Sequence, residues 1–412
     1  MTKRALVLED GTVFEGTAFG AAASGAAEVV FTTGMTGYQE TLTDQSYNGQ
    51  IVVFTYPLVG NTGINRDDVE TLHPTTAGIV CRDIPRRPSN WRSQVSLSEF
   101  CEREGIPGLA DIDTRALARH LRSAGVMKGI FVDARNQNVD SELSSFPPEQ
   151  AEAAAEHLRT TQLPTNQVEQ VSTQSMFPFP LGTYNVILYD FGMKHSILRE
   201  LGRRGCNVTV VPWNTPASAI EQINPDGVVL SNGPGDPDSL RDVQQEIAAI
   251  EQKYPVFGIC LGHQLLCLAN GAHTYKLLFG HRGYNHPVRD LVTGRIDFTS
   301  QNHGYAVDPA SLAGTDLHVT NVEINDDTIE GVRHAALPAF SVQFHPDATG
   351  GPHDGMDLFD RFISLMEYCA SQHKAGKPFH APWQGEKLSV TTADLSAGPA
   401  QYQELSMMEG RN

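Results

Sequence analysis

The segment 255–266, PVFGICLGHQLL, combines a reactive side chain with a backbone that can expose it. A short apolar run leads into a helical pattern, and Cys260 stands at the junction in a Gly-x-Cys-x-Gly arrangement. Glycine lacks a Cβ, so a sharp strand-to-helix turn can form and push the cysteine side chain outward. The N–H groups and dipole at the helix start favour the thiolate. A free cysteine is usually a buried structural thiol, but this context predicts a nucleophile.

A thiolate that attacks a carbonyl group needs donors for the oxyanion that forms. The loop 231–237, SNGPGDP, follows an apolar run at 227–230. Carboxyl ends of neighbouring parallel strands meet at one edge of a sheet, so this loop can reach Cys260. The expected donors are the N–H of Leu261 and a loop N–H near Gly235. Alone the loop is an ordinary Gly/Pro turn, and its place one βα unit before Cys260 supports the functional interpretation.

The thiol also needs a group that takes and returns its proton. The run 340–344, FSVQF, predicts a strand, and His345 and Asp347 leave its end in the sequence His-Pro-Asp. His345 is the best candidate for the base, and Asp347 can orient its ring. The histidines do not form a second cluster at zinc-ligand spacing, so no metal site is predicted. The histidines that compete for the role are His263, His281, His286, His303, His334 and His353.

Apolar runs alternate with helical segments in the second half of the chain, which predicts βαβ units, a buried parallel sheet and an α/β fold. The predicted strands are 185–189, 207–211, 227–230 and 256–259, and the predicted helices include 193–204 and 356–369.

Short alternating runs dominate the first half. They predict strands at 5–8, 28–32 and 50–54. Leu117 and Leu121 stand four apart, which predicts a helix at 113–124 that Asp113 or Thr114 can cap. A short Ala-rich helix is also expected at 149–159.

The length of 412 residues predicts two domains, because one hydrophobic core rarely grows past about 250–300 residues. Near 136–183 the periodicity fades, and prolines punctuate a Ser/Thr/Gln-rich stretch. We therefore expect a first domain at 1–140, a linker region at 141–183, a second domain at 184–375 and a polar C-terminal tail at 376–412.

The charge balance excludes two classes of partner. The chain has 48 acidic and 30 basic residues, a formal net charge of −18. Nucleic acid and anionic membrane surfaces both require basic residues, so neither is an expected partner. The six cysteines are scattered without a CxxC pair, which signals neither a disulfide framework nor a zinc site. With no apolar signal region at the start and no long uncharged apolar run, we expect a soluble cytoplasmic protein.

Several motifs together resemble a known family. GICLGHQ around Cys260, with GPGDP upstream and HPD downstream, resembles the class I (triad) glutamine amidotransferases. The chain is similar to the small, glutaminase chain of carbamoyl-phosphate synthetase over roughly residues 1–375, in collinear order. The N-terminal motifs distinguish this family from other class I amidotransferases, because those proteins share the cysteine elbow but not that first domain. The motifs are TGMTGYQETLTDQSYNGQIVVFTYPLVGNTGIN at 33–65, IDTRALARHLR at 112–122, FGHRGYNHPV at 279–288, TSQNHGYAV at 299–307 and GPHDG at 351–355.

The resemblance implies an N-terminal β-rich small-subunit domain, followed by an amidotransferase domain with a mainly parallel sheet flanked by helices. This chain would hydrolyse L-glutamine to glutamate and ammonia. A larger synthetase chain, which would carry ATP and Mg²⁺, would join that ammonia to bicarbonate and phosphate. No cofactor is implied for this chain. The product is compatible with arginine synthesis, pyrimidine synthesis or both.

The resemblance also implies the site residues. Cys260 would be the nucleophile, His345 the general base and acid, and Asp347 the orienting group. Because Ser46 comes from the first domain, the pocket would lie at a domain boundary. Glutamine would contact Ser46, Gly233, Gly235, Leu261, Gln264, Asn302, Gly304 and Tyr305.

One residue departs from the family pattern, which usually has Glu where this chain has Asp347. The shorter carboxylate is chemically allowed as an orienter, although a displacement of about 1 Å can cost on the order of 10²-fold in rate. One alternative is therefore a non-catalytic regulatory or binding homologue. Another is an amidotransferase subunit that serves a different synthase. Cys260, His345 and the GPGDP loop argue against the first alternative, and the N-terminal motifs argue against the second.

Overall fold

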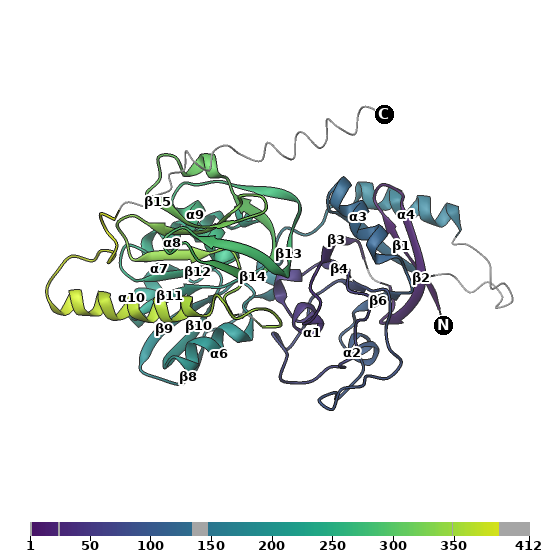
Figure 1. Ribbon diagram of the computed structural model, residues 1–412, viewed down its shortest axis with the longest axis horizontal. Coiled ribbons are helices and arrows are strands. Elements are labelled where there is room, and N and C mark those ends of the chain that lie inside the picture. Colours follow the sequence, from purple (N-terminus) through teal and green to yellow (C-terminus); the bar gives the residue numbers. More distant parts are fainter. Residues whose placement is uncertain (1, 24, 134–146, 348, 387–412) are drawn as a thin grey trace. The chain divides into compact units, whose positions relative to one another are not determined.

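The computed structural model describes residues 2–23, 25–133, 147–347 and 349–386 (Figure 1). Two compact units share the chain. The first comprises Met1–Val171 and Leu278–Tyr284, and the second comprises Ser172–Leu277 and Asn285–Asn412. This division differs from the expected boundaries, because the region 141–183 is shared between the units and a short later segment returns to the first.

The first unit is built on a closed barrel in the order β1-β2-β6-β5-β4-β3-β7. β1 and β2 form an antiparallel hairpin, whereas β3, β4, β5 and β6 pair in parallel. The strands predicted at 5–8, 28–32 and 50–54 correspond to β1, β3 and β4. The barrel strands are β1 (Lys3–Leu8), β2 (Val13–Gly20), β3 (Ala27–Thr32), β4 (Gln50–Phe54), β5 (Gly78–Val80), β6 (Pro107–Ala110) and β7 (Met127–Asp133).

The first unit also contains helices. The helix predicted at 113–124 is confirmed as α3, and its cap is Asp113, whose carboxylate accepts the N–H of Ala116 at 2.9 Å. The predicted Ala-rich helix is α4, which buries Ala155 and Leu158. The helices are α1 (Tyr38–Leu42), η1 (Gln45–Tyr47), α2 (Leu97–Arg103), α3 (Thr114–Ala124), α4 (Pro148–Thr160) and α5 (Gln167–Val171).

Packing explains why the expected linker region is divided. Ala155 of α4 packs with Ala5 and Val7 of β1, so this helix belongs to the barrel. The segment 278–284 also joins the first unit, where the N–H of Val126 donates to the carbonyl of Leu278 at 2.9 Å. At the other end of the region, β8 pairs with β10 and belongs to the second unit.

The second unit contains a ten-stranded mixed sheet in the order β14-β13-β15-β16-β17-β12-β11-β9-β10-β8. Its central strands β10, β9, β11, β12 and β17 are parallel, which confirms the predicted α/β fold. β11 and β12 are buried throughout, as expected for strands covered on both faces. The strands are β8 (Phe177–Pro180), β9 (Tyr184–Asp190), β10 (Cys206–Pro212), β11 (Gly227–Leu230), β12 (Val256–Ile259), β13 (Thr274–Asp290), β14 (Ile296–Val307), β15 (Leu317–Glu323), β16 (Ile329–His334) and β17 (Ala339–Val342).

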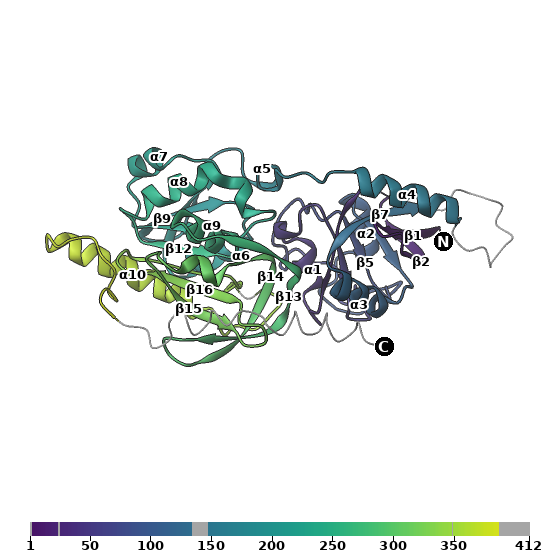
Figure 2. The same ribbon diagram turned by 90° about the horizontal axis from the view of Figure 1, so that it is seen from above.

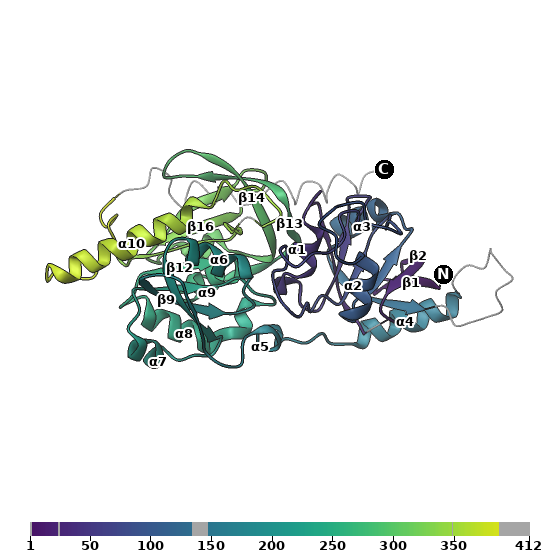
Figure 3. The ribbon, with the colours of Figure 1, turned by 90° about the horizontal axis from the view of Figure 1, so that it is seen from below.

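Helices flank the parallel strands of this sheet. α6 and α10 share one hydrophobic core with β9, β10, β12 and β17 (Figures 1 and 3). α8 and α9 pack against each other across the sheet from α10 (Figure 2). The predicted helices at 193–204 and 356–369 correspond to α6 and α10. The helices are α6 (His195–Arg203), α7 (Ala217–Ile223), η2 (Pro237–Leu240), α8 (Arg241–Ile250), α9 (Leu261–Ala269), η3 (Pro309–Leu312) and α10 (Asp357–Lys374).

The described part of the chain after α10 is anchored. Trp383 is buried, its indole N–H donates to the carbonyl of His334 at 2.8 Å, and its ring lies against the guanidinium groups of Arg333 and Arg361. The expected polar tail therefore does not begin at 376, since residues up to 386 include packed side chains. Among the described helices, none has the length and apolar composition needed to cross a membrane.

Candidate active site

Cys260 occupies a sharp turn between β12 and α9. Its backbone has φ 54° and ψ −105°, a conformation that is costly for a residue with a side chain. The turn is held in place because the N–H of Cys260 donates to the carbonyl of Val342 in β17 at 2.9 Å. A Cβ on Gly262 would lie 2.3 Å from the carbonyl oxygen of Leu230, and a Cβ on Gly258 would lie 2.7 Å from the carbonyl oxygen of Gly262. Both glycines are therefore required by close backbone contacts.

The thiol itself is buried. Its Sγ lies 3.6 Å from the carbonyl oxygen of Asn302 in β14. Leu261 is the first residue of α9, so its N–H has no acceptor within the helix and is available to a bound oxyanion. The local geometry thus places a cysteine side chain beside a helix N-terminus, as the sequence predicts.

The loop 231–237 reaches the elbow. The N–H of Gly262 donates to the carbonyl of Ser231 at 3.0 Å. A Cβ on Gly233 would meet the side chain of Leu261 at 2.8 Å, which places the loop backbone beside the first turn of α9. Gly235 has φ +91°, a conformation that favours glycine. The loop and the elbow therefore share one edge of the sheet.

His345 lies just beyond β17, which ends at Val342, two residues earlier than predicted. The backbone N–H of His345 donates to the backbone carbonyl of Ser300 in β14 at 2.9 Å, so this strand anchors the turn that carries the imidazole. Burial alone would lower the pKa of His345, but the negative charges of Cys260 and Asp347 outweigh burial and raise it well above its usual range. The ring is thus suited to hold a proton beside the sulfur.

The carboxylate of Asp347 contacts both His345 and a cation. Its Oδ1 lies 3.7 Å from Nδ1 of His345, within ion-pair distance but longer than a hydrogen bond. Its Oδ2 pairs with Nζ of Lys194 and accepts the hydroxyl of Ser196 at 2.7 Å. Burial alone would raise the pKa of the Asp347 carboxyl, but the positive charges of Lys194 and His345 hold it well below its usual range. The carboxylate stays ionised.

The remaining predicted contacts of the second unit lie on α9 and β14. Nε2 of Gln264 donates to the carbonyl of Tyr305 at 2.8 Å and to Oε1 of Gln343 at 2.9 Å. Asn302 is buried, whereas Gly304 and Tyr305 are partly exposed. Hydrogen bonds of Cys260 and Gln264 to β14 therefore bring α9 and this strand together.

Ser46 is the one predicted site residue in the first unit. It is buried in η1, where its N–H donates to the Asp44 carboxylate at 2.9 Å. This bond fixes the local turn that presents the serine.

Two of the competing histidines have structural partners. His263 is fully buried with Nδ1 2.8 Å from the hydroxyl of Ser341, and burial lowers its pKa to about 3. Nδ1 of His334 accepts the N–H groups of Ala336 and Leu337, both at 3.0 Å. Neither arrangement involves the thiol of Cys260.

Sequence reasoning missed Lys194 and Ser196. Both lie where the β9 loop enters α6, at the same carboxyl edge of the sheet as Cys260. Polar residues at that edge are a recognisable signal, but nothing local to them indicates a partner about 150 residues later.

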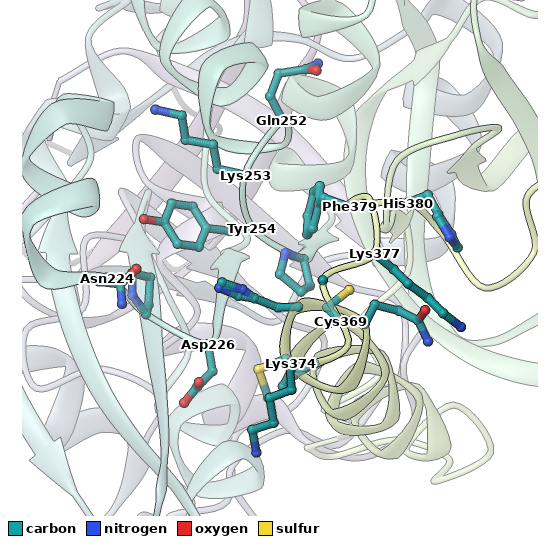
Figure 4. Close-up of a pocket in the computed structure, with 17 residues that line it drawn as sticks. Asn224, Asp226, Gln252, Lys253, Tyr254, Cys369, Lys374, Lys377, Phe379 and His380 are labelled. Atoms are coloured by element: carbon teal, nitrogen blue, oxygen red, sulfur yellow. The ribbon is translucent and has the colours of Figure 1, made fainter.

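A second hollow of the same unit is separate from these residues. It is an open groove of about 920 Å³ at the amino ends of β11 and β12, the opposite ends from Cys260. Figure 4 shows Tyr254, from the loop before β12, and Cys369 and Lys374, from α10, around this groove. No residue predicted to contact glutamine lines it.

The buried thiol, imidazole and carboxylate, together with the N–H at the start of α9, can perform covalent acyl transfer. A thiolate attacks a carbonyl carbon, backbone N–H groups stabilise the oxyanion, and the imidazole moves the proton.

Comparison with known proteins relates both units to one family. A family described as "Carbamoyl-phosphate synthase small chain, CPSase domain" matches residues 6–131, and "Glutamine amidotransferase class-I" matches residues 187–365. The chain is 56% identical over 367 residues to the carbamoyl phosphate synthase small chain of Lactococcus lactis subsp. cremoris, covering 89% of this chain and 99% of that relative. It is 54% identical over 379 residues to the carbamoyl phosphate synthase pyrimidine-specific small chain of Lactiplantibacillus plantarum, covering 92% and 100%. These matches confirm the resemblance inferred from the motifs.

Proposed function

This chain belongs to the carbamoyl phosphate synthase small chain family, and from that premise we propose that it hydrolyses glutamine at Cys260 and delivers ammonia to a larger synthetase chain. The main support for placing the active site here is the sharp turn at Cys260 between β12 and α9. Cys260 adopts a left-handed backbone between two glycines that have no room for a Cβ, beside the buried pair of His345 and Asp347. Strain of this kind persists where the surrounding structure holds it in place, and such strain clusters at active sites.

The reaction follows from these groups. The Cys260 thiolate attacks the carbon of the side-chain amide and forms a C–S bond with its own electron pair, while the π pair of the C=O bond moves to the amide oxygen. The N–H groups of Leu261 and the Gly235 region stabilise that oxyanion. When the tetrahedral species collapses, the C–N bond breaks, the imidazolium of His345 gives its proton to the departing nitrogen, and a γ-glutamyl thioester remains. His345 then takes a proton from water, whose oxygen replaces the sulfur and releases glutamate.

The roles of the other residues follow from their positions. Asp347 orients the ring of His345 and balances its charge. Gly233 and Gly235 let the loop backbone approach the substrate, and Gln264, Asn302, Gly304 and Tyr305 contribute contacts from α9 and β14. Ser46 is a further substrate contact in this proposal.

The proposal includes the division of labour. The large chain would bind ATP and Mg²⁺ and use the ammonia to make carbamoyl phosphate, whereas this chain needs no cofactor for the thiol chemistry. Cytoplasmic location, expected from the sequence, is part of the same proposal. One relative is described as pyrimidine-specific, so we assign the product to pyrimidine synthesis, with arginine synthesis as the other use.

A glutaminase assay tests the proposal. We expect slow glutamine hydrolysis by the full chain, faster hydrolysis when a carbamoyl-phosphate synthetase large chain and ATP are added, and loss of both activities in Cys260→Ser. Cys369→Ser, which changes a thiol in the groove of Figure 4, serves as the control. Complex formation without hydrolysis would instead identify a non-catalytic homologue. Hydrolysis that a large chain never stimulates would identify a subunit of another synthase.

A further inference from the structure

One oxygen of the Asp347 carboxylate interacts with three side-chain donors. Oδ2 pairs with Nζ of Lys194 and accepts the hydroxyls of Ser196 at 2.7 Å and Thr349 at 3.3 Å. Lys194 is the N-cap residue of α6 and Ser196 is the second residue of that helix. Two of the three donors therefore come from one rigid helix start, far from Asp347 in the sequence.

The other oxygen has a different environment. Within the ranges that the structure describes, Oδ1 of Asp347 and both ring nitrogens of His345 have no hydrogen-bond partner. Oδ1 and Nδ1 lie 3.7 Å apart, and both side chains are buried. The separation exceeds the usual hydrogen-bond length by only a few tenths of an ångström, so these two unsatisfied atoms are the natural partners of one another.

We propose that Ser196, together with Lys194, is a positioning residue for glutamine hydrolysis, because it holds Oδ2 and so presents Oδ1 to His345. This inference rests on the proposed function. It also accounts for the short side chain at this place. A glutamate would carry its carboxylate about 1.5 Å further from the backbone, into space that the three donors already occupy.

The two residues contribute differently. Lys194 is a point charge on a flexible stem and chiefly keeps the buried carboxylate ionised. The Ser196 hydroxyl sits on a short side chain in the first turn of α6, so it fixes the direction of the carboxylate. The charged groups that act on the ring of His345 are Cys260, Asp347 and Lys194, and Ser196→Ala changes none of them. Its effect on the pH profile therefore reports orientation and not charge.

The test compares Ser196→Ala with Ser311→Ala in the full chain. The hydroxyl of Ser311 also makes short hydrogen bonds, accepting from the N–H of His273 at 2.8 Å and donating to the carbonyl of Asp308 at 2.7 Å, outside the proposed site. We expect Ser196→Ala to lower kcat about tenfold, as for a lost hydrogen bond to a charged group, with KM changed less than about twofold. The alkaline limb of the kcat/KM profile should move to lower pH, because a poorly oriented Asp347 stabilises the His345 imidazolium less. Ser196→Thr, which keeps the hydroxyl, should restore most of the rate.

A second readout does not depend on glutamine. The pH dependence of Cys260 alkylation by iodoacetamide should shift to higher pH in Ser196→Ala and not in Ser311→Ala, because a less stabilised His345 imidazolium supports the neighbouring thiolate less. Thermal unfolding of each variant separates misfolding from mispositioning. The inference is wrong if a folded Ser196→Ala matches Ser311→Ala in kcat and in both pH profiles, or if only KM changes. A wild-type chain without glutaminase activity would overturn the proposed function, and the alkylation profile would still decide the role of Ser196.

Discussion

The thiol of Cys260 and the carbonyl of Asn302 face each other at 3.6 Å, which joins the start of α9 to β14. The contact fixes the position of the sulfur at the start of α9, beside the backbone of β14. In the proposed mechanism, the site uses this one sulfur among the six cysteines.

We predict that iodoacetamide modifies Cys260 selectively in the native chain near pH 7. Burial raises the pKa of the other five thiols, to about 12 for Cys101 and to about 11 for Cys206 and Cys369. The reactive species is the thiolate, so those five should stay unmodified until the chain unfolds. Peptide mass spectrometry before and after urea treatment checks this, and preferential labelling of any other cysteine in the folded chain would contradict it.

Gly262→Ala should disrupt the elbow. Its Cβ would lie 2.3 Å from the carbonyl oxygen of Leu230, so β11 or α9 must shift. We expect a loss of stability of about 2 kcal/mol or more, as for overpacking in a close-packed core, and loss of most glutaminase activity. Gly25→Ala is the matched control, because a Cβ there meets no atom within 4 Å. Urea unfolding curves and initial rates of both variants provide the comparison. Equal behaviour of the two would show that the turn has room for a side chain.

Asp347→Asn should destabilise the chain in a pH-dependent way. The folded-state pKa of Asp347 is depressed, so its stabilising contribution is complete above the unfolded value of about 3.9 and declines as pH falls toward the folded value. Breaking the buried pair with Lys194 should cost about 3 kcal/mol at pH 7. Below about pH 4 the wild-type carboxylate becomes protonated. The difference in unfolding free energy between wild type and Asp347→Asn should then narrow by about 1.4 kcal/mol per pH unit.

Urea unfolding at pH 7, 5 and 3, followed by circular dichroism, measures this difference. The exposed carboxylate of Asp238 provides the control variant Asp238→Asn. A gap between wild type and Asp347→Asn that stays constant down to pH 3 would rule out a depressed pKa as its source.

Trp383→Ala should loosen the segment that follows α10. The indole is buried, contacts the guanidinium groups of Arg333 and Arg361 at 5.5 and 5.6 Å from the ring centroid, and donates to the carbonyl of His334. Truncation of a buried tryptophan costs about 3–5 kcal/mol. Trp91, which is 90% exposed, provides the matched variant Trp91→Ala. We expect a clear fall in Tm for Trp383→Ala only, and a comparable fall in both variants would contradict the packing described.

Much of the fold and site follows from the sequence because local sterics and hydrogen bonds decide it. The glycines around Cys260 predict the elbow, since only residues without a Cβ tolerate its close backbone contacts. Asp113 predicts the start of α3 because its carboxylate satisfies an N–H three residues later. These interactions join residues close in the chain, so the pattern and the structure agree. The roles of the individual glutamine contacts stay predictions.

Packing between distant segments decides what the sequence leaves open. From the sequence alone, α4 is compatible with a linker, and only the packing of Ala155 against Ala5 and Val7 of β1 assigns it to the barrel. Likewise, Trp383 lies in a polar stretch of sequence, and only its contacts with Arg333 and Arg361 show that the segment is packed. The short carboxylate of Asp347 looks like a departure from the family pattern, yet donors some 150 residues earlier in the chain hold it in place. By itself, the sequence determined the elbow, the caps and the α/β class, because those depend on neighbours within a few residues. Only the tertiary structure decided the domain boundary, the course of the C-terminal segment and the partners of Asp347, because those depend on which surfaces meet when the chain folds.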